Sequence, residues 1–351
     1  MFLVPSFRLG GSENFIITLV SSLDKSKFDI SILLINTKDS RIIKFPDHID
    51  LIDLGSSRVR YSMFKILNYV YSKKPHILFS TVSHLNLYVS ILKYFLPKGV
   101  KVIARETNTI SNRYMDQPYP IIFKILYKIF YNNIDIFVAQ SRHMAKDLEK
   151  FNVVGSKIKI IYNPVDVEKI KTMSMEPCID FEKEGLRLLS VGSLVNQKGH
   201  DILLKALAKV NVDFHLIILG EGYLRGELIM LSEALGISDR VQFLGQIENP
   251  YRYMENANFL ILSSRYEGLP NVVLEAHVCG LPVISFNSPG GASEIITDNE
   301  NGVLVSELSP SSLALAVNRA SLNDFCGKNI SSKVNERFAV EKIIPIYENI
   351  F

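Results

Sequence analysis

Short apolar runs alternate with helix-forming segments over most of the chain, a pattern typical of parallel strands connected by covering helices. This alternation predicts an α/β protein, and a length of 351 residues allows two domains of ordinary size. The predicted strands are 2–4, 28–35, 49–54, 76–80, 101–104, 134–139, 186–192, 214–219, 241–245, 258–262 and 281–285.

Residues 263–296 contain the most informative strand–helix–strand unit in this pattern. A strand ends near Ser263, a turn runs to Pro270, and helix-forming residues follow until Gly280, which suits a helix C-cap. Ligands of parallel sheets bind at the carboxyl ends of the strands, in front of helix N-termini. The unpaired amides and the positive dipole end of this helix therefore predict an anion site at the loop 264–270.

Two carboxylates flank the predicted anion site. Glu267 lies in the loop, and Glu275 lies about one and a half turns into the helix. A carboxylate beside an anion is unfavourable unless it has another partner, such as the hydroxyl groups of a sugar. By spacing alone, two solvated surface glutamates are an equally good interpretation.

The composition indicates a globular protein, with 47% hydrophobic and 21% charged residues. Three cysteines without a C-x-x-C pair suit a reducing compartment, and we expect a cytoplasmic protein. The chain shows no signal-peptide pattern and no apolar run near the roughly 20 residues that a spanning helix needs. It has no G-x-G-x-x-G sequence, so we do not expect NAD or FAD as a cofactor.

Charge is unevenly distributed along the chain. Residues 1–165 carry 23 lysines and arginines against 12 acidic residues, whereas the remainder carries 16 against 24. This excess predicts an anionic partner for the first half.

Two basic and aromatic segments lie in this first half, at 58–65 and 119–131. Lys124 and Lys128 are four residues apart and share one face of the second predicted helix. Lysine combined with tyrosine and phenylalanine is typical of helices that lie in a membrane interface. A sheet-covering helix with solvated lysines is the alternative; with the charge excess, we expect peripheral contact with anionic lipid.

The string S-S-R-Y-E-G-L-P-N-V-V-L-E-A, followed by C-G-L-P-V-I-S and P-G-G-A-S-E-I-I, resembles the donor-site signature of retaining glycosyltransferases of family 4. The resemblance extends over nearly the whole chain. It implies the α/β fold called GT-B, in which two Rossmann-like domains face a central cleft. It also implies an acceptor-binding domain at 1–165, a donor-binding domain at 166–338, and a C-terminal helix, 339–351, that packs back on the first domain.

The resemblance assigns roles to the two glutamates. In this family the second glutamate binds the ribose hydroxyls of the nucleotide, which implies that role for Glu275. The first contacts the transferred sugar, which implies that role for Glu267. The same motif places Gly268, Leu269 and Asn271 at the nucleotide sugar.

A second donor loop, ending in Lys198-Gly199, resembles the family sequence G-R-L-x-x-x-K-G, whose arginine and lysine neutralise the donor diphosphate. Lys198 matches, and the resemblance implies that it stabilises the diphosphate during catalysis. Ser193 stands in place of the arginine and brings no charge. Arg8 and Arg265 are the candidates to supply the missing charge.

Further positions carry over from the family in the same way. At the end of the predicted strand 101–104, relatives keep a catalytic polar residue, often histidine, that faces the acceptor. This implies catalytic roles for Arg105 and Glu106, whose side chains we expect to face the cleft. The resemblance also implies contact with the donor phosphates by Gly10 and Gly11, and with the base by Gly245, Gln246 and Ile247.

We therefore expect a retaining transferase that moves a hexose or N-acetylhexosamine from a UDP-sugar to an acceptor hydroxyl. The expected acceptor is a glycan, lipid-linked in bacterial surface polysaccharide synthesis, with the enzyme bound peripherally at the inner face of the plasma membrane. No D-x-D sequence occurs, so we expect neither a metal nor another cofactor, and we expect no nucleic-acid partner. Two alternatives remain: a UDP-sugar 2-epimerase of the same fold, and a non-catalytic sugar-nucleotide-binding protein.

Overall fold

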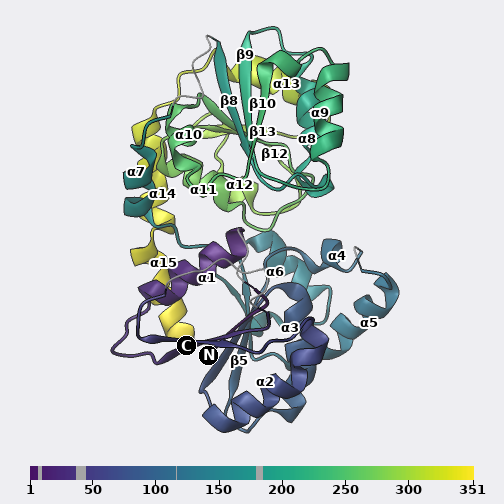
Figure 1. Cartoon of the computed structure of the whole chain (residues 1–351), viewed down its shortest axis with the longest axis vertical. Helices are drawn as coiled ribbons and strands as arrows, with labels where there is room; N and C mark the ends of the chain where they lie inside the picture. Colours follow the sequence, from purple (N-terminus) through teal and green to yellow (C-terminus); the bar gives the residue numbers. More distant parts are fainter. Residues whose placement is uncertain (7–9, 37–44, 116, 179–184) are drawn as a thin grey trace. The chain divides into compact units, whose positions relative to one another are not determined.

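The computed structural model describes residues 1–6, 10–36, 45–115, 117–178 and 185–351, and the chain divides into two compact units. Unit 1 comprises residues 1–164 and 340–351, and unit 2 comprises residues 165–339. Each unit is built on a parallel sheet of its own (Figure 1).

The sheet of unit 1 has seven parallel strands in the order β3-β2-β1-β4-β5-β6-β7. Central strands of this sheet are almost wholly apolar, as expected for strands that are covered on both faces. The strands are β1 (Phe2–Val4), β2 (Ile30–Leu34), β3 (Ile49–Asp53), β4 (Ile77–Thr81), β5 (Lys101–Arg105), β6 (Ile136–Ala139) and β7 (Ile158–Ile160).

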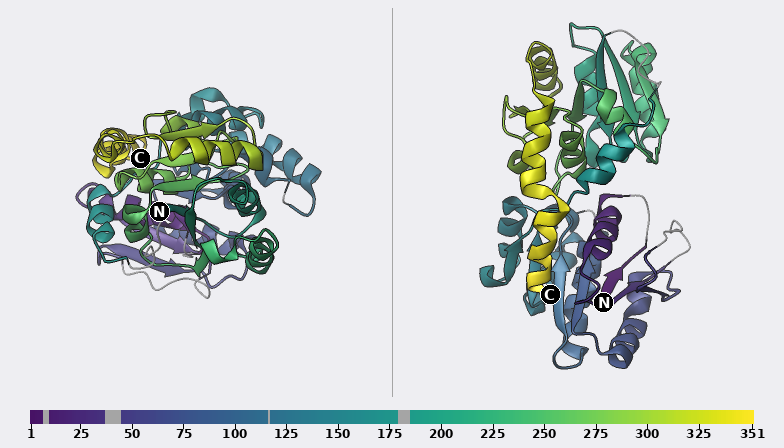
Figure 2. Two further views of the ribbon diagram at one scale, coloured as in Figure 1. Left: turned by 90° about the horizontal axis from the view of Figure 1, so that it is seen from above. Right: turned by 90° about the vertical axis from the view of Figure 1, so that its left-hand side faces the viewer.

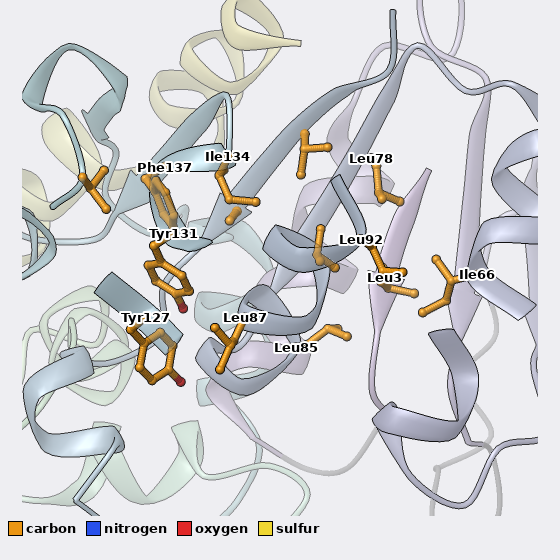
Figure 3. Packing of buried hydrophobic residues seen from close by; sticks show 14 of the residues in the cluster. Leu3, Ile66, Leu78, Leu85, Leu87, Leu92, Tyr127, Tyr131, Ile134 and Phe137 are labelled. Carbon is orange, nitrogen blue, oxygen red and sulfur yellow. The ribbon is translucent and has the colours of Figure 1, made fainter. Parts of the chain in front are cut away.

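Helices cover both faces of this sheet. On one face, Leu85 and Leu87 pack with Tyr127 and Tyr131 against strand residues such as Leu78 (Figure 3). On the other face, the core is formed with the first helix and the last helix of the chain. The helices are α1 (Gly11–Ser22), α2 (Val59–Lys73), α3 (Ser83–Leu92), α4 (Ile110–Arg113), α5 (Pro120–Phe130), α6 (Arg142–Glu149) and α15 (Val340–Ile350), with 3-10 turns η1 (Lys93–Phe95), η2 (Tyr131–Asn133) and η3 (Gly155–Lys157).

The last helix, α15, returns to unit 1 and lies beside α1, as the yellow and purple ribbons of Figure 2 show. It buries Ile343, Ile344 and Tyr347 in the unit 1 core. The ring of Tyr347 lies 5.6 Å from the ring of Phe15 on α1. The two ends of the chain thus share one hydrophobic core.

The sheet of unit 2 has six parallel strands in the order β10-β9-β8-β11-β12-β13. The strands are β8 (Leu186–Val191), β9 (Phe214–Leu219), β10 (Val241–Gly245), β11 (Phe259–Leu262), β12 (Val283–Phe286) and β13 (Gly302–Val305). The helices are α7 (Val167–Ser174), α8 (His200–Leu207), α9 (Arg225–Ala234), α10 (Tyr251–Asn256), α11 (Asn271–Val278), α12 (Ala292–Ile295), α13 (Pro310–Ala320) and α14 (Gly327–Phe338).

Both sheets reverse their strand order once, between β1 and β4 in unit 1 and between β8 and β11 in unit 2. Such a switch point leaves a crevice at the carboxyl ends of the two strands, where ligands of open α/β sheets bind. In unit 2, the loops after β8 and β11 are the two loops that the sequence singles out.

The predicted strand–helix–strand unit, from the strand 258–262 to the strand 281–285, is confirmed by β11, α11 and β12. In unit 1, the connection from β4 to α3 is unusually short. Helix α3 begins at Ser83, only one residue after β4 ends at Thr81. Val82 makes this sharp turn with φ +78°, a strained conformation for a β-branched residue.

In the described part of the chain, no helix combines the length and the apolar character needed to cross a bilayer.

Candidate active site

The loops after β8 and β11 are joined by hydrogen bonds at the switch point of unit 2. Ser263 Oγ donates to the carbonyl of Lys198 at 2.9 Å, and the amide of Arg265 donates to the carbonyl of Gln197 at 2.8 Å. Gly199 permits this approach, because a Cβ there would lie 2.2 Å from the carbonyl oxygen of Ser263 and its φ is +65°. The two loops therefore form one rigid platform.

An ion pair between Lys198 and Glu267 lies on this platform. Lys198 Nζ is 2.6 Å from Glu267 Oε1, and Ser264 Oγ donates to the same oxygen at 2.6 Å. Glu267 is buried and Lys198 is partly buried, so this contact is shielded from solvent. The structure thus brings together two residues that the sequence predicts to act on the same sugar diphosphate, 69 positions apart.

Ser264 belongs to this group although the sequence motif assigns it no role. Its position three residues before Glu267 is a signal, because a serine at this spacing in a tight turn can reach the carboxylate.

The loop 288–291 is joined to the turn that precedes α11 by two backbone hydrogen bonds. The amide of Glu267 donates to the carbonyl of Pro289 at 3.0 Å, and the amide of Gly291 donates to the carbonyl of Gly268 at 2.7 Å. Gly268 and Leu269 are buried within this turn, directly before α11. These contacts fix the N-terminal end of the helix, where the amides and the dipole favour an anion.

Glu275 lies on α11, on the same helical face as Asn271 four residues earlier. Its side chain is partly buried, and burial raises the pKa of this carboxyl to about 7, while Lys169 on α7 acts in the opposite direction. Among the described residues, no side chain donates a hydrogen bond to the Glu275 carboxylate. A carboxylate in this state is well suited to accept hydrogen bonds from a ligand.

The structure corrects one expectation about charge. Arg265 Nη1 and Nη2 bind both oxygens of Asp201 at 2.9 and 2.8 Å, and Nη1 also donates to the carbonyl of Asn196. Burial alone would raise the pKa of Asp201, but the Arg265 guanidinium holds it below its ordinary value. Arg265 is thus committed to this pair and does not replace the charge missing at Ser193, which is exposed. Arg8, the other candidate, lies outside the described residues.

The loop predicted to meet the base follows β10. The amide of Gly220 donates to the carbonyl of Gly245 at 2.7 Å, which fixes the start of this loop beside β9. Gln246 is exposed and Ile247 is partly exposed. Their contact with a base stays a prediction.

In unit 1, Gly10 is the N-cap of α1 and Gly11 is its first residue. The carboxylate of Glu13 folds back over this turn, and a Cβ at Gly10 would lie 2.7 Å from Glu13 Oε2. The phosphate contact implied for this turn also stays a prediction.

Arg105 and Glu106 were expected to face the cleft from the end of β5; the structure instead buries both side chains, so this expectation is wrong. Each residue is only 1% exposed. Arg105 Nη2 donates to Asn163 Oδ1 at 2.6 Å, and its guanidinium lies 3.5 Å from the centre of the Phe15 ring. Partners from distant parts of the sequence therefore turn this side chain inward.

Glu106 accepts three hydrogen bonds inside unit 1. The donors are Ser83 Oγ at 2.5 Å, Asn86 Nδ2 at 2.7 Å and the Tyr131 hydroxyl at 2.8 Å. Burial raises the pKa of this carboxyl, and the three donors oppose that effect. The network joins β5 to the first turn of α3 and to η2, which follows α5.

No group of three or more histidine, cysteine, aspartate or glutamate side chains within the described ranges is arranged to hold a metal ion. Independence from metals stays a prediction.

Two family models match the chain. Glycosyltransferase Family 4 matches residues 9–169, and Glycosyl transferases group 1 matches residues 179–337.

Curated relatives match over most of their length. The chain is 28% identical over 323 residues to a Campylobacter jejuni protein named N-acetylgalactosamine-N,N'-diacetylbacillosaminyl-diphospho-undecaprenol 4-alpha-N-acetylgalactosaminyltransferase, with 86% of this chain and 84% of that protein covered. It is also 28% identical over 322 residues to the C. jejuni GalNAc-alpha-(1->4)-GalNAc-alpha-(1->3)-diNAcBac-PP-undecaprenol alpha-1,4-N-acetyl-D-galactosaminyltransferase, with 87% and 83% covered.

Solved structures share the fold of the whole chain. Anabaena Alr3699/HepE in complex with UDP and glucose superimposes with a TM-score of 0.81 at 20% identity, covering 99% of this chain and 98% of that one. WaaG, a glycosyltransferase involved in lipopolysaccharide biosynthesis, superimposes with a TM-score of 0.75 at 16% identity and the same coverage.

Proposed function

We propose a donor, an acceptor and residue roles for this chain, which belongs to glycosyltransferase family 4 and is a glycosyltransferase of the GT-B fold. The proposed reaction moves a hexose or N-acetylhexosamine from a UDP-sugar to a hydroxyl of a lipid-linked glycan, with retention of the anomeric configuration. Two relatives are named for transfer onto undecaprenol-linked glycans, and HepE has been solved with UDP-glucose. These names support the proposed donor and acceptor classes.

The Lys198–Glu267 ion pair at the turn into α11 is the observation that carries this proposal. Negative charge grows on the leaving diphosphate as the glycosidic bond breaks. Lys198 and the amides before α11 oppose that charge more strongly in the transition state than in the ground state. Glu267, held by Lys198 and Ser264, is then placed to orient the transferred sugar.

The remaining roles follow from position. Glu275 accepts hydrogen bonds from the ribose hydroxyls, one helical turn after Asn271 on the same face of α11. Retention is proposed to occur by attack of the acceptor hydroxyl on the face that the diphosphate leaves. A phosphate oxygen of the donor takes the acceptor proton, so this step needs no protein base. The buried Glu106 network stabilises the fold around this chemistry.

Acceptor-dependent release of UDP tests the proposal. Purified protein is incubated with UDP-glucose, UDP-galactose, UDP-N-acetylglucosamine or UDP-N-acetylgalactosamine, with and without undecaprenyl-diphosphate-linked sugars. We expect UDP release that depends on the acceptor for one of these donors. Conversion of the donor into its 2-epimer without an acceptor would support the epimerase alternative. Binding of UDP without turnover of any donor would support a non-catalytic protein.

The membrane contact proposed for unit 1 is supported by an unusual exposed face on α5. Its residues Ile121, Ile122, Ile125 and Ile129 are 74%, 53%, 51% and 57% exposed, and the exposed Lys124 and Lys128 lie between them. Exposed isoleucines interspersed with lysines fit a helix that lies in the interface of an anionic bilayer. We call these six residues the α5 face.

Exposed aromatic residues also occur on two elements that are linked to α5, namely α2 and η1. Phe64 on α2 is 81% exposed, and Tyr94 on η1 packs its ring 6.3 Å from Phe130 at the end of α5. The hydroxyl of Tyr71 on α2 donates to the carbonyl of Phe95 at 3.0 Å. These contacts connect α2, η1 and α5, so one membrane surface can engage all three.

Reversing the charge of the α5 face should release the protein from anionic vesicles. Each lysine near such a surface contributes about 1 kcal/mol, so Lys124→Glu/Lys128→Glu is expected to weaken binding at least tenfold. The measurement is co-sedimentation with phosphatidylglycerol-containing vesicles. The matched control is Lys146→Glu/Lys205→Glu, which makes the same charge change at exposed lysines on α6 and α8. An equal loss in both variants would point to net charge alone and contradict a role for the α5 face.

Ser193 offers a gain-of-affinity prediction in unit 2. Ser193→Arg restores the guanidinium that the family sequence has beside the diphosphate, and a hydrogen bond to a charged group contributes about 1.5–3 kcal/mol. We expect UDP to bind about tenfold more tightly by calorimetry. Ser238→Arg, at an exposed serine before β10, is the control. Unchanged UDP affinity in Ser193→Arg would show that this loop does not face the diphosphate.

A further inference from the structure

The buried guanidinium of Arg105 has an unusual environment in unit 1. Among the described residues, no carboxylate lies within ion-pair distance of it. A buried charge without a paired ion is unfavourable, so its partners need to be strong ones. They are the Asn163 amide oxygen at 2.6 Å, the face of Phe15 at 3.5 Å and the Thr81 hydroxyl at 3.4 Å.

One of these partners, Asn163, lies where the chain leaves unit 1, and another, Phe15, packs against the helix by which the chain returns. Asn163 directly precedes Pro164, after which the chain leaves unit 1. The chain re-enters unit 1 at Val340, and α15 carries Tyr347 to the ring of Phe15 that Arg105 covers. The Tyr347 hydroxyl is near enough to Arg105 to raise its pKa, against the larger lowering by burial to about 10.

The same two segments are also paired just outside unit 1. The amide of Val165 donates to the carbonyl of Phe338 at 2.8 Å, and Val165 and Ala339 form an isolated parallel β-bridge. Inside unit 1, Asn163 Nδ2 donates to Gln140 Oε1 at 2.9 Å, and Gln140 Nε2 donates to the Glu106 carbonyl at 2.5 Å. The exit segment is therefore tied to the ends of β5 and β6 by side chains.

We propose that Arg105 is a positioning residue that holds the exit segment around Asn163 and the returning helix α15 in one fixed arrangement. Lysine cannot replace it, because a single ammonium does not offer a planar face to Phe15 and a separate donor to Asn163. Arg105 thus fixes, on the unit 1 side, both segments by which the chain passes to and from unit 2.

Hydrogen–deuterium exchange of the full chain tests this role without any substrate. Arg105→Met and Arg105→Lys are each expected to raise amide exchange at least tenfold in peptides that cover 161–165 and 340–351. Peptides from β8 to β13 should not change. Arg142→Met, an arginine exposed on α6, is the control and should leave both segments protected.

A double variant makes the test sharper. Asn163→Ala alone should raise amide exchange in the exit segment. Adding Asn163→Ala to Arg105→Met should raise exchange in that segment less than threefold further, because Arg105→Met has already removed the Arg105–Asn163 hydrogen bond. Loosening of only one segment, or uniform loosening of all strands of unit 1, would overturn the proposal. Arg105→Lys keeps the charge, so it provides the test if Arg105→Met does not fold.

The kinetic part of the test rests on the proposed function. Arg105→Lys should lower kcat at least tenfold and leave the Kd for UDP within twofold, because most residues proposed to bind UDP lie in unit 2. An equal loss in kcat and UDP affinity would contradict a positioning role. If the unaltered protein transfers no sugar, the proposed function fails, and the exchange measurement still decides the role of Arg105.

Discussion

Lys198→Met is expected to lower the rate of sugar transfer by a factor of about 10²–10³, the usual effect of removing one group that stabilises developing negative charge. Lys198 is partly buried and lies 2.6 Å from Glu267, where few solvent molecules weaken its field. Arg265, the other cation that the sequence offers to the diphosphate in the described part of unit 2, is paired with Asp201. The measurement is kcat for UDP release with the donor and acceptor identified in the screen.

The loss of activity has a competing explanation, because Lys198→Met also leaves Glu267 buried without its cation. That change alone would destabilise unit 2. The double variant Lys198→Met/Glu267→Gln measures the stability effect alone, since glutamine needs no cation, and we expect its thermal stability to exceed that of Lys198→Met. Because Glu267 is itself assigned to the sugar, transfer is compared in Lys198→Met alone, at a temperature at which circular dichroism shows that this variant is folded. Normal transfer by the folded Lys198→Met variant would show that Lys198 acts only by supporting the fold, and Lys205→Met on α8 serves as the control for loss of one positive charge.

Glu275→Gln is expected to weaken UDP binding by about 1–3 kcal/mol and to reduce its pH dependence to that of the UDP phosphate itself. Burial holds the pKa of Glu275 near 7, so the group is partly protonated at neutral pH. Ribose hydroxyls bind the ionised form more strongly, because it is the better acceptor. In the unaltered protein, UDP affinity should therefore rise as pH increases from 6 to 8, by up to tenfold for each unit below the pKa.

Calorimetry in buffers of different ionisation enthalpy provides the direct measurement. Binding of UDP at pH 6.5 should release protons in the unaltered protein and release fewer in Glu275→Gln. Tyr251 and Cys279 lie near Glu275, but burial raises the pKa of both far above this range, so neither accounts for the released proton. A UDP affinity in Glu275→Gln equal to that of the unaltered protein would refute the ribose role.

The same carboxyl also affects stability without ligand. Its pKa is raised in the folded state, so between its ordinary value of 4.5 and about 7 the folded protein binds more protons than the unfolded chain. The free energy of unfolding therefore falls as pH rises through this window. In Glu275→Gln this part of the pH dependence should be absent from denaturant titrations.

Local sequence signals were sufficient to predict much of unit 2. Pro270 and Gly280 mark the two ends of α11, and the apolar runs on either side predict β11 and β12. The start of α3 was not predictable in this way, because Val82 adopts its positive φ without a local glycine or asparagine. Tertiary contacts, and not the local sequence, stabilise that turn.

In the candidate site, too, residues of a continuous motif were predictable, whereas contacts between residues far apart in the sequence were not. The motif around Glu267 and Glu275 is continuous in sequence, so both residues could be singled out before the fold was known. Arg265 was a candidate from the sequence to contact the donor diphosphate. In the structure it pairs with Asp201, a residue 64 positions away, and this pair could not be read from the local sequence. Burial of Arg105 depends on Asn163, 58 positions away, and on Phe15, so the sequence alone placed it too near the surface.

The loops after β8, β11 and β12 are joined by hydrogen bonds, and this packing limits where the specificity for the nucleotide sugar could be changed by mutation. At Gly199 and Gly290 a single added carbon would collide with a neighbouring main-chain oxygen, so few residues around the ion pair tolerate replacement. Gln246 and Ile247 retain solvent-accessible side chains. Libraries aimed at accepting other nucleotides should therefore be randomised after β10, where most variants will still fold.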